Sequence, residues 1–162
     1  MDLLFEFFLV VPTFFMNSVF PLMMSSIKTN NEKRFSALAK KSGLFLFFLS
    51  IILVAAGWVL SPFLPIVMGE FADSILPFRI LLLSLPVFFL TSVTMWVMVA
   101  RNLRGPLLGI YSSSMVVNIL ANVLLVPRFG YISAAWVTVF SEVFILLLSF
   151  LAIRLSPKAQ KS

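Results

Sequence analysis

The sequence predicts an all-α membrane protein, a polytopic helical bundle with five transmembrane helices. Three observations lead to this class. First, 61% of the 162 residues are hydrophobic and 11% are charged, with a mean hydropathy of +1.11, whereas soluble domains are about 25% charged. Second, five segments hold the ~20 mostly apolar residues that a helix needs to cross a bilayer. Third, most Lys and Arg residues fall on one side of the membrane once these segments are threaded through it.

The five expected spans follow one another with short connections. They are Leu3–Ser26, Gly43–Leu60, Leu76–Ala100, Pro106–Val126 and Tyr131–Ile153. The chain then divides into a first transmembrane helix at residues 1–27, a basic cytoplasmic linker at 28–42, four further transmembrane helices at 43–155, and a cytoplasmic tail at 156–162.

We expect the first span to be a retained helix and not a signal peptide. A secretory signal begins with a basic region, but this chain begins with Asp2 and Glu6 and has no base before its first apolar run. The linker that follows is too short for a soluble domain with its own core. Phe35 and Leu38 are three residues apart in it, which predicts a helical lead-in to the second span that lies on the membrane surface with its apolar side toward lipid.

The distribution of basic residues predicts the orientation. Ten of the twelve Lys and Arg residues fall on one side: Lys28, Lys33, Arg34, Lys40, Lys41, Arg101, Arg104, Arg154, Lys158 and Lys161. Only Arg79 and Arg128 fall on the other side. Cytoplasmic loops carry the excess of positive charge, so we expect a multi-pass protein of the inner or plasma membrane with its N-terminus outside and its C-terminus in the cytoplasm. Aromatic residues expected at the two interfaces fit this map: Trp58, Trp136 and Tyr131 outside, Trp96 and Tyr111 inside.

The composition also limits the chemistry. The chain has no Cys and no His, which excludes thiol nucleophiles, imidazole acid–base catalysis and Cys/His metal sites. It contains no glycine-rich phosphate loop and no catalytic pair. We therefore expect no enzyme activity, no cofactor, no metal and no nucleic-acid partner.

Glu142, near the middle of the last span, is the most costly residue to bury. A carboxylate at that depth costs roughly 2–4 kcal/mol, so it is expected to face the bundle interior or a wet cavity. Thr138 lies one turn earlier on the same face. The pair indicates either a substrate, ion or proton site, or a buried hydrogen bond that ties the last helix to the one before it.

Two further sets of polar residues are candidates for a substrate cavity. Ser114, Asn118 and Asn122 are four residues apart and form one polar stripe on the fourth span. This stripe either lines a cavity or makes hydrogen bonds between helices. Arg101 and Arg104, at the cytoplasmic end of the third span, either enforce orientation and contact lipid phosphates or bind an anionic lipid-linked substrate.

The last two spans, VVNILANVLLVPRFGYISAAWVTVFSEVFILLL, show a specific pattern. A helix containing Asn ends in a Pro-basic-x-Gly turn, and the next helix opens with small residues and carries a Ser-Glu pair. This pattern resembles the polysaccharide and O-antigen flippases of the multidrug/oligosaccharidyl-lipid/polysaccharide superfamily. The residues concerned are Asn118, Asn122, Pro127, Arg128, Gly130, Ala134, Ala135, Ser141 and Glu142.

Two earlier segments, SVFPLMMSSIKTNNEKRFSALAKKS and VMGEFADSILPFRILLLSLPVFFL, are also similar to that family. The resemblance implies that the chain is part of the C-terminal lobe of a transporter with 12 to 14 helices, with residues 43–155 forming a polysaccharide-synthesis C-terminal-like region. Such transporters flip lipid-linked oligosaccharide or polysaccharide repeat units by alternating access. The implied partners are the bilayer, that lipid-linked substrate and an N-terminal lobe in the same or a separate chain.

Two other functions stay open at the level of sequence. One is a cation-coupled multidrug exporter of the same superfamily, in which Glu142 would be the coupling acid. The other is a truncated or assembly subunit that does not itself transport.

Overall fold

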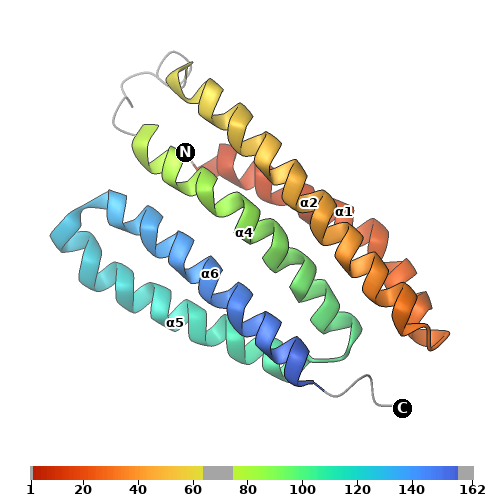
Figure 1. The fold of residues 1–162 in the computed structure, drawn as a ribbon. Coiled ribbons are helices and arrows are strands. Elements are labelled where there is room, and N and C mark those ends of the chain that lie inside the picture. Colours follow the sequence, from red (N-terminus) through yellow and green to blue (C-terminus); the bar gives the residue numbers. More distant parts are fainter. Residues whose placement is uncertain (1, 64–74, 157–162) are drawn as a thin grey trace.

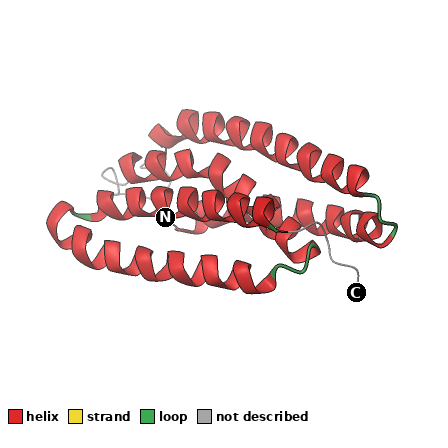
Figure 2. Ribbon diagram, turned by 60° about the horizontal axis from the view of Figure 1, so that its bottom comes forward, coloured by secondary structure: helices red, strands yellow, loops and turns green. Residues whose placement is uncertain are grey.

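The computed structural model describes residues 2–63 and 75–156, and the regular structure in these ranges is helical (Figures 1 and 2). Its elements are α1 (Asp2–Lys28), α2 (Glu32–Leu60), the 3₁₀ turn η1 (Ser61–Phe63), α4 (Ile75–Ala100), α5 (Arg104–Phe129) and α6 (Tyr131–Leu155). In these ranges five helices are long and apolar enough to cross a membrane. The predicted class, an all-α protein with five membrane-spanning helices, is confirmed.

Helix α4 lies at the centre of the bundle. Figure 1 shows α1 and α2 on one side of it and α6, followed by α5, on the other. Helix α4 packs on α1, α2 and α6, whereas α5 packs mainly on α6. Helices α1, α4 and α6 run in one direction and α2 and α5 in the opposite one, so that α1 begins and α6 ends at opposite ends of the bundle (Figure 1).

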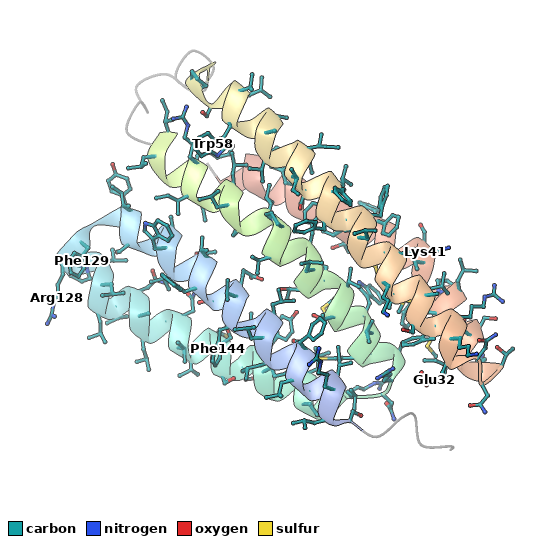
Figure 3. All side chains as sticks on the ribbon, in the orientation of Figure 1. Glu32, Lys41, Trp58, Arg128, Phe129 and Phe144 are labelled. Carbon is teal, nitrogen blue, oxygen red and sulfur yellow. The ribbon has the colours of Figure 1, made fainter. Side chains whose placement is uncertain are left out.

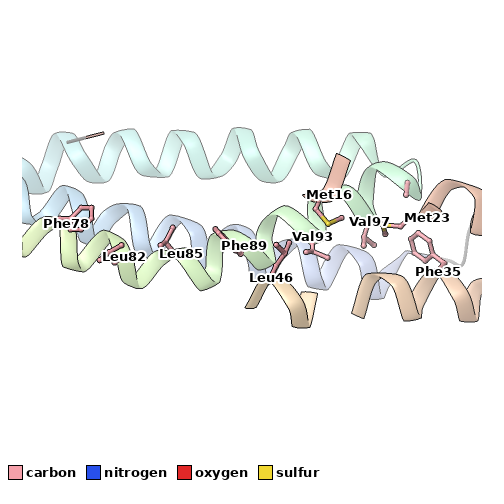
Figure 4. Packing of buried hydrophobic residues seen from close by; sticks show 11 residues of the cluster. Met16, Met23, Phe35, Leu46, Phe78, Leu82, Leu85, Phe89, Val93 and Val97 are labelled. Carbon is pink, nitrogen blue, oxygen red and sulfur yellow. The ribbon is translucent and has the colours of Figure 1, made fainter. Parts of the chain in front are cut away.

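The main apolar core is built on one face of α4. Its buried residues recur every three or four positions, as a single helix face requires; Figure 4 shows them in a row, and they are Phe78, Leu82, Leu85, Phe89, Val93 and Val97. Met16 and Met23 of α1 and Phe35 and Leu46 of α2 complete this core. A smaller cluster joins Met98 of α4 to Ile110 of α5 and Ile145 of α6.

Two turns at one end of the bundle share the same construction. Asn30 after α1 and Asn102 after α4 both have positive φ, 54° and 59°. After α4, the amide of Asn102 donates to the Val99 carbonyl at 3.0 Å and the amide of Leu103 to the Met98 carbonyl at 2.9 Å. The same pair of bonds follows α1. This Schellman arrangement satisfies the last carbonyls of a helix, and Asn is the residue other than Gly that best adopts it.

Helix α2 begins earlier than the sequence predicts. Asn31 caps it, its side-chain oxygen accepting from the amide of Arg34 at 2.9 Å, and the helix then runs unbroken for 29 residues. Phe35 is 2% exposed and belongs to the main core. The expected helical lead-in is therefore present and continuous with the span, but its expected position, with Phe35 toward lipid, is wrong, because Phe35 is buried in the same cluster as Val97 and Ala100 of α4.

The extra length of α2 extends beyond the hydrocarbon. At 1.5 Å per residue the helix is about 43 Å long, against about 30 Å of bilayer core. Glu32 and Lys41 are both at the end of the bundle where α2 begins, and Arg128 is at the opposite end (Figure 3). We call the end where α2 and α5 begin the basic end. The sidedness predicted for it, toward the cytoplasm, stays a prediction.

Arg79, close to the opposite end, is held by aromatic and hydroxyl groups. Its Nε donates to Ser61 Oγ at 2.8 Å, and its guanidinium carbon lies 5.3 Å from the centre of the Trp58 ring. Residues 64–74 lie outside the described part of the chain, and with them Glu70 and Asp73, the acidic residues that could partner Arg79. Lys158 and Lys161 of the tail also lie outside it.

Candidate functional site

Glu142 lies on a continuous stripe of α6. Ala135, Thr138, Glu142, Ile145 and Ser149 follow one another at spacings of three and four residues, which places them on one helix face. Ala135, Ile145 and Ser149 of this stripe are buried. The stripe is therefore the packing face of α6, and Glu142 is the acidic residue within it, near the middle of the span.

The carboxyl group of Glu142 has one buried oxygen atom, Oε2, without a hydrogen bond in the described structure. The hydroxyl of Ser149, seven residues further along the same stripe, is in the same condition. A buried polar atom left without a partner costs about 1–3 kcal/mol, so two of them on one face mark a place where a ligand, a water molecule or another polypeptide would be stabilised.

The polar stripe of α5 meets α6 directly beside this face. Asn118 donates through Nδ2 to the Oγ atom of Ser141, the residue that precedes Glu142, at 2.8 Å. Asn122 donates to the Asn118 side-chain oxygen and to its carbonyl, both at 3.0 Å. Ser114 is buried. Of the two interpretations of this stripe, the structure shows the hydrogen bond between helices at Asn118.

Thr138 makes a local bond. Its hydroxyl donates to the Ala134 carbonyl one turn earlier at 3.1 Å, an arrangement open to any Thr in a helix. Asn118 thus lies beside the Glu142 region through its bond to Ser141, and Asn122 is joined to that region only through Asn118.

The arginines of the basic end form a different region. Arg101 reaches Glu32 at 3.5 Å and stacks over the Phe35 ring at 5.3 Å, while Arg104 is exposed. Arg101 shares a groove with Ile153, which is eleven residues beyond Glu142 and hence about 16 Å away along the helix axis. Arg101 and Glu142 therefore do not belong to one compact site.

Three residues of these two regions, Ser141, Ser149 and Glu32, were not among the site residues predicted from the sequence. Ser141 was visible only as part of a motif, and its role as the partner of Asn118 depends on which helices are neighbours. Ser149 carries a readable signal, because it repeats Glu142 at the seven-residue spacing of a packing seam. Glu32 belongs to the predicted linker, and only the tertiary fold brings it to Arg101.

The Glu142 region offers one carboxyl group on α6, with the bond from Asn118 to Ser141 at the preceding residue. No group of three or more His, Cys, Asp or Glu side chains comes together in residues 2–63 and 75–156. A lone carboxyl in such surroundings accepts hydrogen bonds from a polar ligand, exchanges a proton or balances one cation.

Comparison with protein-family models, with curated proteins and with solved structures gives no match for this chain. The fold and the site geometry define a multi-pass membrane protein whose five long helices contact the lipid bilayer.

Proposed function

We propose that this chain is part of a membrane transporter that flips lipid-linked oligosaccharide or polysaccharide repeat units across the membrane by alternating access. The observation that carries the proposal is the carboxyl group of Glu142, whose Oε2 atom is buried in the middle of α6 with no hydrogen-bond partner among the residues that the structure describes. Ionisable groups inside a membrane are expensive, and they typically mark a substrate, ion or proton path.

The surroundings of Glu142 suit a saccharide better than an apolar ligand. A sugar headgroup carries many hydroxyls, whose transfer through the bilayer is costly unless each finds a partner. A carboxylate oxygen and the amides of Asn118 and Asn122 accept and donate such hydrogen bonds. The resemblance to polysaccharide flippases rests on the same residues and implies a second lobe that would supply the facing wall.

A cation-coupled exporter is the second candidate, and the same buried carboxyl favours it. In that case Glu142 would bind the coupling proton or sodium ion, and the exported compound would be an organic cation. The third candidate, an assembly subunit without transport activity, predicts a stable complex with a separate chain. An antibody against the tail, SPKAQKS, applied to source membranes distinguishes an 18 kDa product from a longer one.

The deciding experiment compares wild-type protein with Glu142→Gln in vesicles from cells that carry the complete gene. Flipping is followed with a fluorescent polyprenyl-diphosphate oligosaccharide, and export with ethidium under imposed Na⁺ and H⁺ gradients. We expect the variant to lose flipping. Phe144→Leu, a change on the lipid-exposed side of the same helix, is the control and is expected to flip normally.

Each other outcome has a clear meaning. Loss of gradient-driven ethidium export with flipping unchanged would replace the flippase by the cation-coupled exporter. Normal flipping and normal export in Glu142→Gln would remove both transport proposals and leave the carboxyl a structural role.

A further inference from the structure

A groove runs along α4 between α2 and α6 at the basic end of the bundle. Helices α2 and α6 both pack on α4, and the space between them encloses about 510 Å³. Its floor is formed by α4 with Val93 and Val97, and its walls by Leu44 and Phe47 of α2 and Leu146 and Phe150 of α6. We call this the apolar groove.

The apolar groove adjoins a charged depression of about 530 Å³ around the first turns of α2. Lys33, Lys40 and Arg101 line it together with Glu32, which leaves a net charge of +2. Ser36, Lys40 and Arg101 line both spaces, so the two are adjacent. We call the second space the charged basin.

The dimensions of the two spaces match those of a lipid molecule in one leaflet. From Leu90 to Arg101 the groove follows α4 for eleven residues, or about 16 Å, and one leaflet contributes about half of the ~30 Å hydrocarbon thickness. The charged basin lies in the part of α2 that extends beyond the hydrocarbon, where lipid headgroups are found.

We propose that the apolar groove and the charged basin together bind one anionic glycerophospholipid, with an acyl chain along α4 and the phosphate between Lys40 and Arg101. Charge complementarity selects the headgroup: the basin is cationic, and the Arg101 Nε atom is buried without a hydrogen-bond partner in the described structure. The half-exposed Glu32 contacts Arg101 only at 3.5 Å, so it does not replace a phosphate. The leaflet-deep groove fits an acyl chain and not a long polyprenyl chain.

Gly43 keeps the groove open. A Cβ atom at this position would lie 3.8 Å from Leu90 Cδ2, an ordinary contact, so the first carbon of a larger side chain fits and the remainder enters the groove. Gly109 of α5 has nothing within 4 Å of the same position. The substitutions Gly43→Leu and Gly109→Leu therefore form a matched pair, of which the first alone fills the groove.

The test uses native mass spectrometry of the full chain in detergent. After delipidation, the protein is offered dioleoylphosphatidylglycerol, dioleoylphosphatidylcholine, which has the same tails, and a polyprenyl phosphate. We expect phosphatidylglycerol to bind at least about fivefold more tightly than phosphatidylcholine, because each surface cation contributes about that factor toward an anionic lipid.

The variants locate the site. Lys40→Gln is expected to weaken phosphatidylglycerol binding about fivefold, and Lys41→Gln, which removes the same charge outside both spaces, to leave it unchanged. Gly43→Leu is expected to abolish the bound lipid and Gly109→Leu to retain it, with circular dichroism showing that both variants are folded.

Three results would overturn the proposal. Equal binding of the two dioleoyl lipids would mean that headgroup charge is not recognised. Equal losses in Lys40→Gln and Lys41→Gln would mean that the attraction is spread over the whole basic end. Tighter binding of the polyprenyl phosphate than of phosphatidylglycerol would assign the groove to a polyprenyl lipid instead.

Discussion

Helices α4 and α5 are similar in sequence character and different in environment. Their most apolar regions have mean hydropathies of 2.1 and 1.7, yet 56% of that region is buried in α4 and 11% in α5. Helix α4 has protein neighbours on most of its surface, while α5 packs mainly on α6 at the edge of the bundle (Figure 1). Hydropathy therefore locates a helix in the membrane but does not tell whether its neighbours are protein or lipid, since lipid tails are as apolar as leucine.

The polar residues of the two helices differ in the same way. In α4, Ser84, Thr91 and Thr94 are buried and bond to carbonyls of their own helix, at 2.6 to 2.9 Å. In α5, Asn118 bonds across to α6. Small hydroxyl residues let neighbouring helices approach α4 closely, and the amide of Asn118 attaches α5 to a single partner.

The largest expected effect is on the free energy of unfolding, which should fall much more when a buried leucine of α4 is truncated than when a lipid-facing leucine of α5 is. Leu85 of α4 is 0% exposed and Leu124 of α5 is 61% exposed. We expect Leu85→Ala to lower the free energy of unfolding by about 3 kcal/mol, because it leaves a cavity that the surrounding helices fill only in part. Leu124→Ala is expected to change it by less than about 0.5 kcal/mol. Reversible unfolding in mixed micelles, followed by circular dichroism, measures both; equal losses would remove the distinction between the two helices.

The second effect concerns the turn between α5 and α6, which depends on the backbone conformation of Gly130. Gly130 has φ 73° and ψ −172°, a region open essentially to Gly alone, and no atom lies within 4 Å of where its Cβ would be. Gly130→Ala is expected to cost about 2 kcal/mol through backbone strain alone. The same micelle unfolding measures it, and an unchanged stability would show that α5 does not depend on this turn for its place beside α6.

Substitutions of glycine by alanine are expected to change stability in opposite directions on α2, which packs on α4, and on α5. A Cβ at Gly57 of α2 would lie 2.7 Å from Leu82 Cδ1 of α4, whose side chain is fully buried. We expect Gly57→Ala to destabilise by about 1 kcal/mol through overpacking, and Gly109→Ala on α5 to stabilise by up to about 1 kcal/mol through helix propensity. Adding Leu82→Ala to the first variant should remove its clash, which a double-mutant cycle detects; strict additivity would contradict the assigned contact.

The smallest effect concerns the bond from Asn118 to Ser141. Hydrogen bonds between helices in membranes contribute about 0.6 kcal/mol on average, so we expect a coupling energy near that value between Asn118→Ala and Ser141→Ala. Ser113, which bonds to a carbonyl of its own helix at 2.9 Å, is the control, and Ser113→Ala should show no coupling to Ser141→Ala. A coupling of zero for the first pair would leave α5 without its polar attachment.

Much of this fold is readable from the sequence. The five spans were predicted to within a few residues at most of their ends, because charged residues and long apolar runs delimit a bilayer-crossing helix. The exception is the start of α2, where Phe35 and Leu38 also fit a surface helix and where the tertiary contact with Arg101 determines the outcome. The central place of α4 was not predictable, since leucines facing lipid and leucines facing protein look the same.

The candidate site was predictable only in part, because the sequence shows which residues share a helix face but not which helices are neighbours. Helical spacing places Ser114, Asn118 and Asn122 on one stripe, and it places Thr138 on the same face as Glu142. The sequence does not tell that Asn118 contacts Ser141, nor that Arg101 shares a groove with Ile153, eleven residues beyond Glu142 on α6. Those facts depend on which helices are neighbours and on how far each one is shifted along the membrane normal.

The central functional claim is that Glu142 borders a path that water and a polar substrate can enter. The chain has no Cys, so Glu142→Cys and the lipid-side Phe144→Cys each introduce one thiol for labelling with a cationic methanethiosulfonate in native membranes. These reagents require the thiolate, which forms in water and is suppressed in lipid. The account predicts rapid modification at position 142, slowed by a lipid-linked oligosaccharide, and no modification at position 144. Equal, slow labelling at both positions would contradict it.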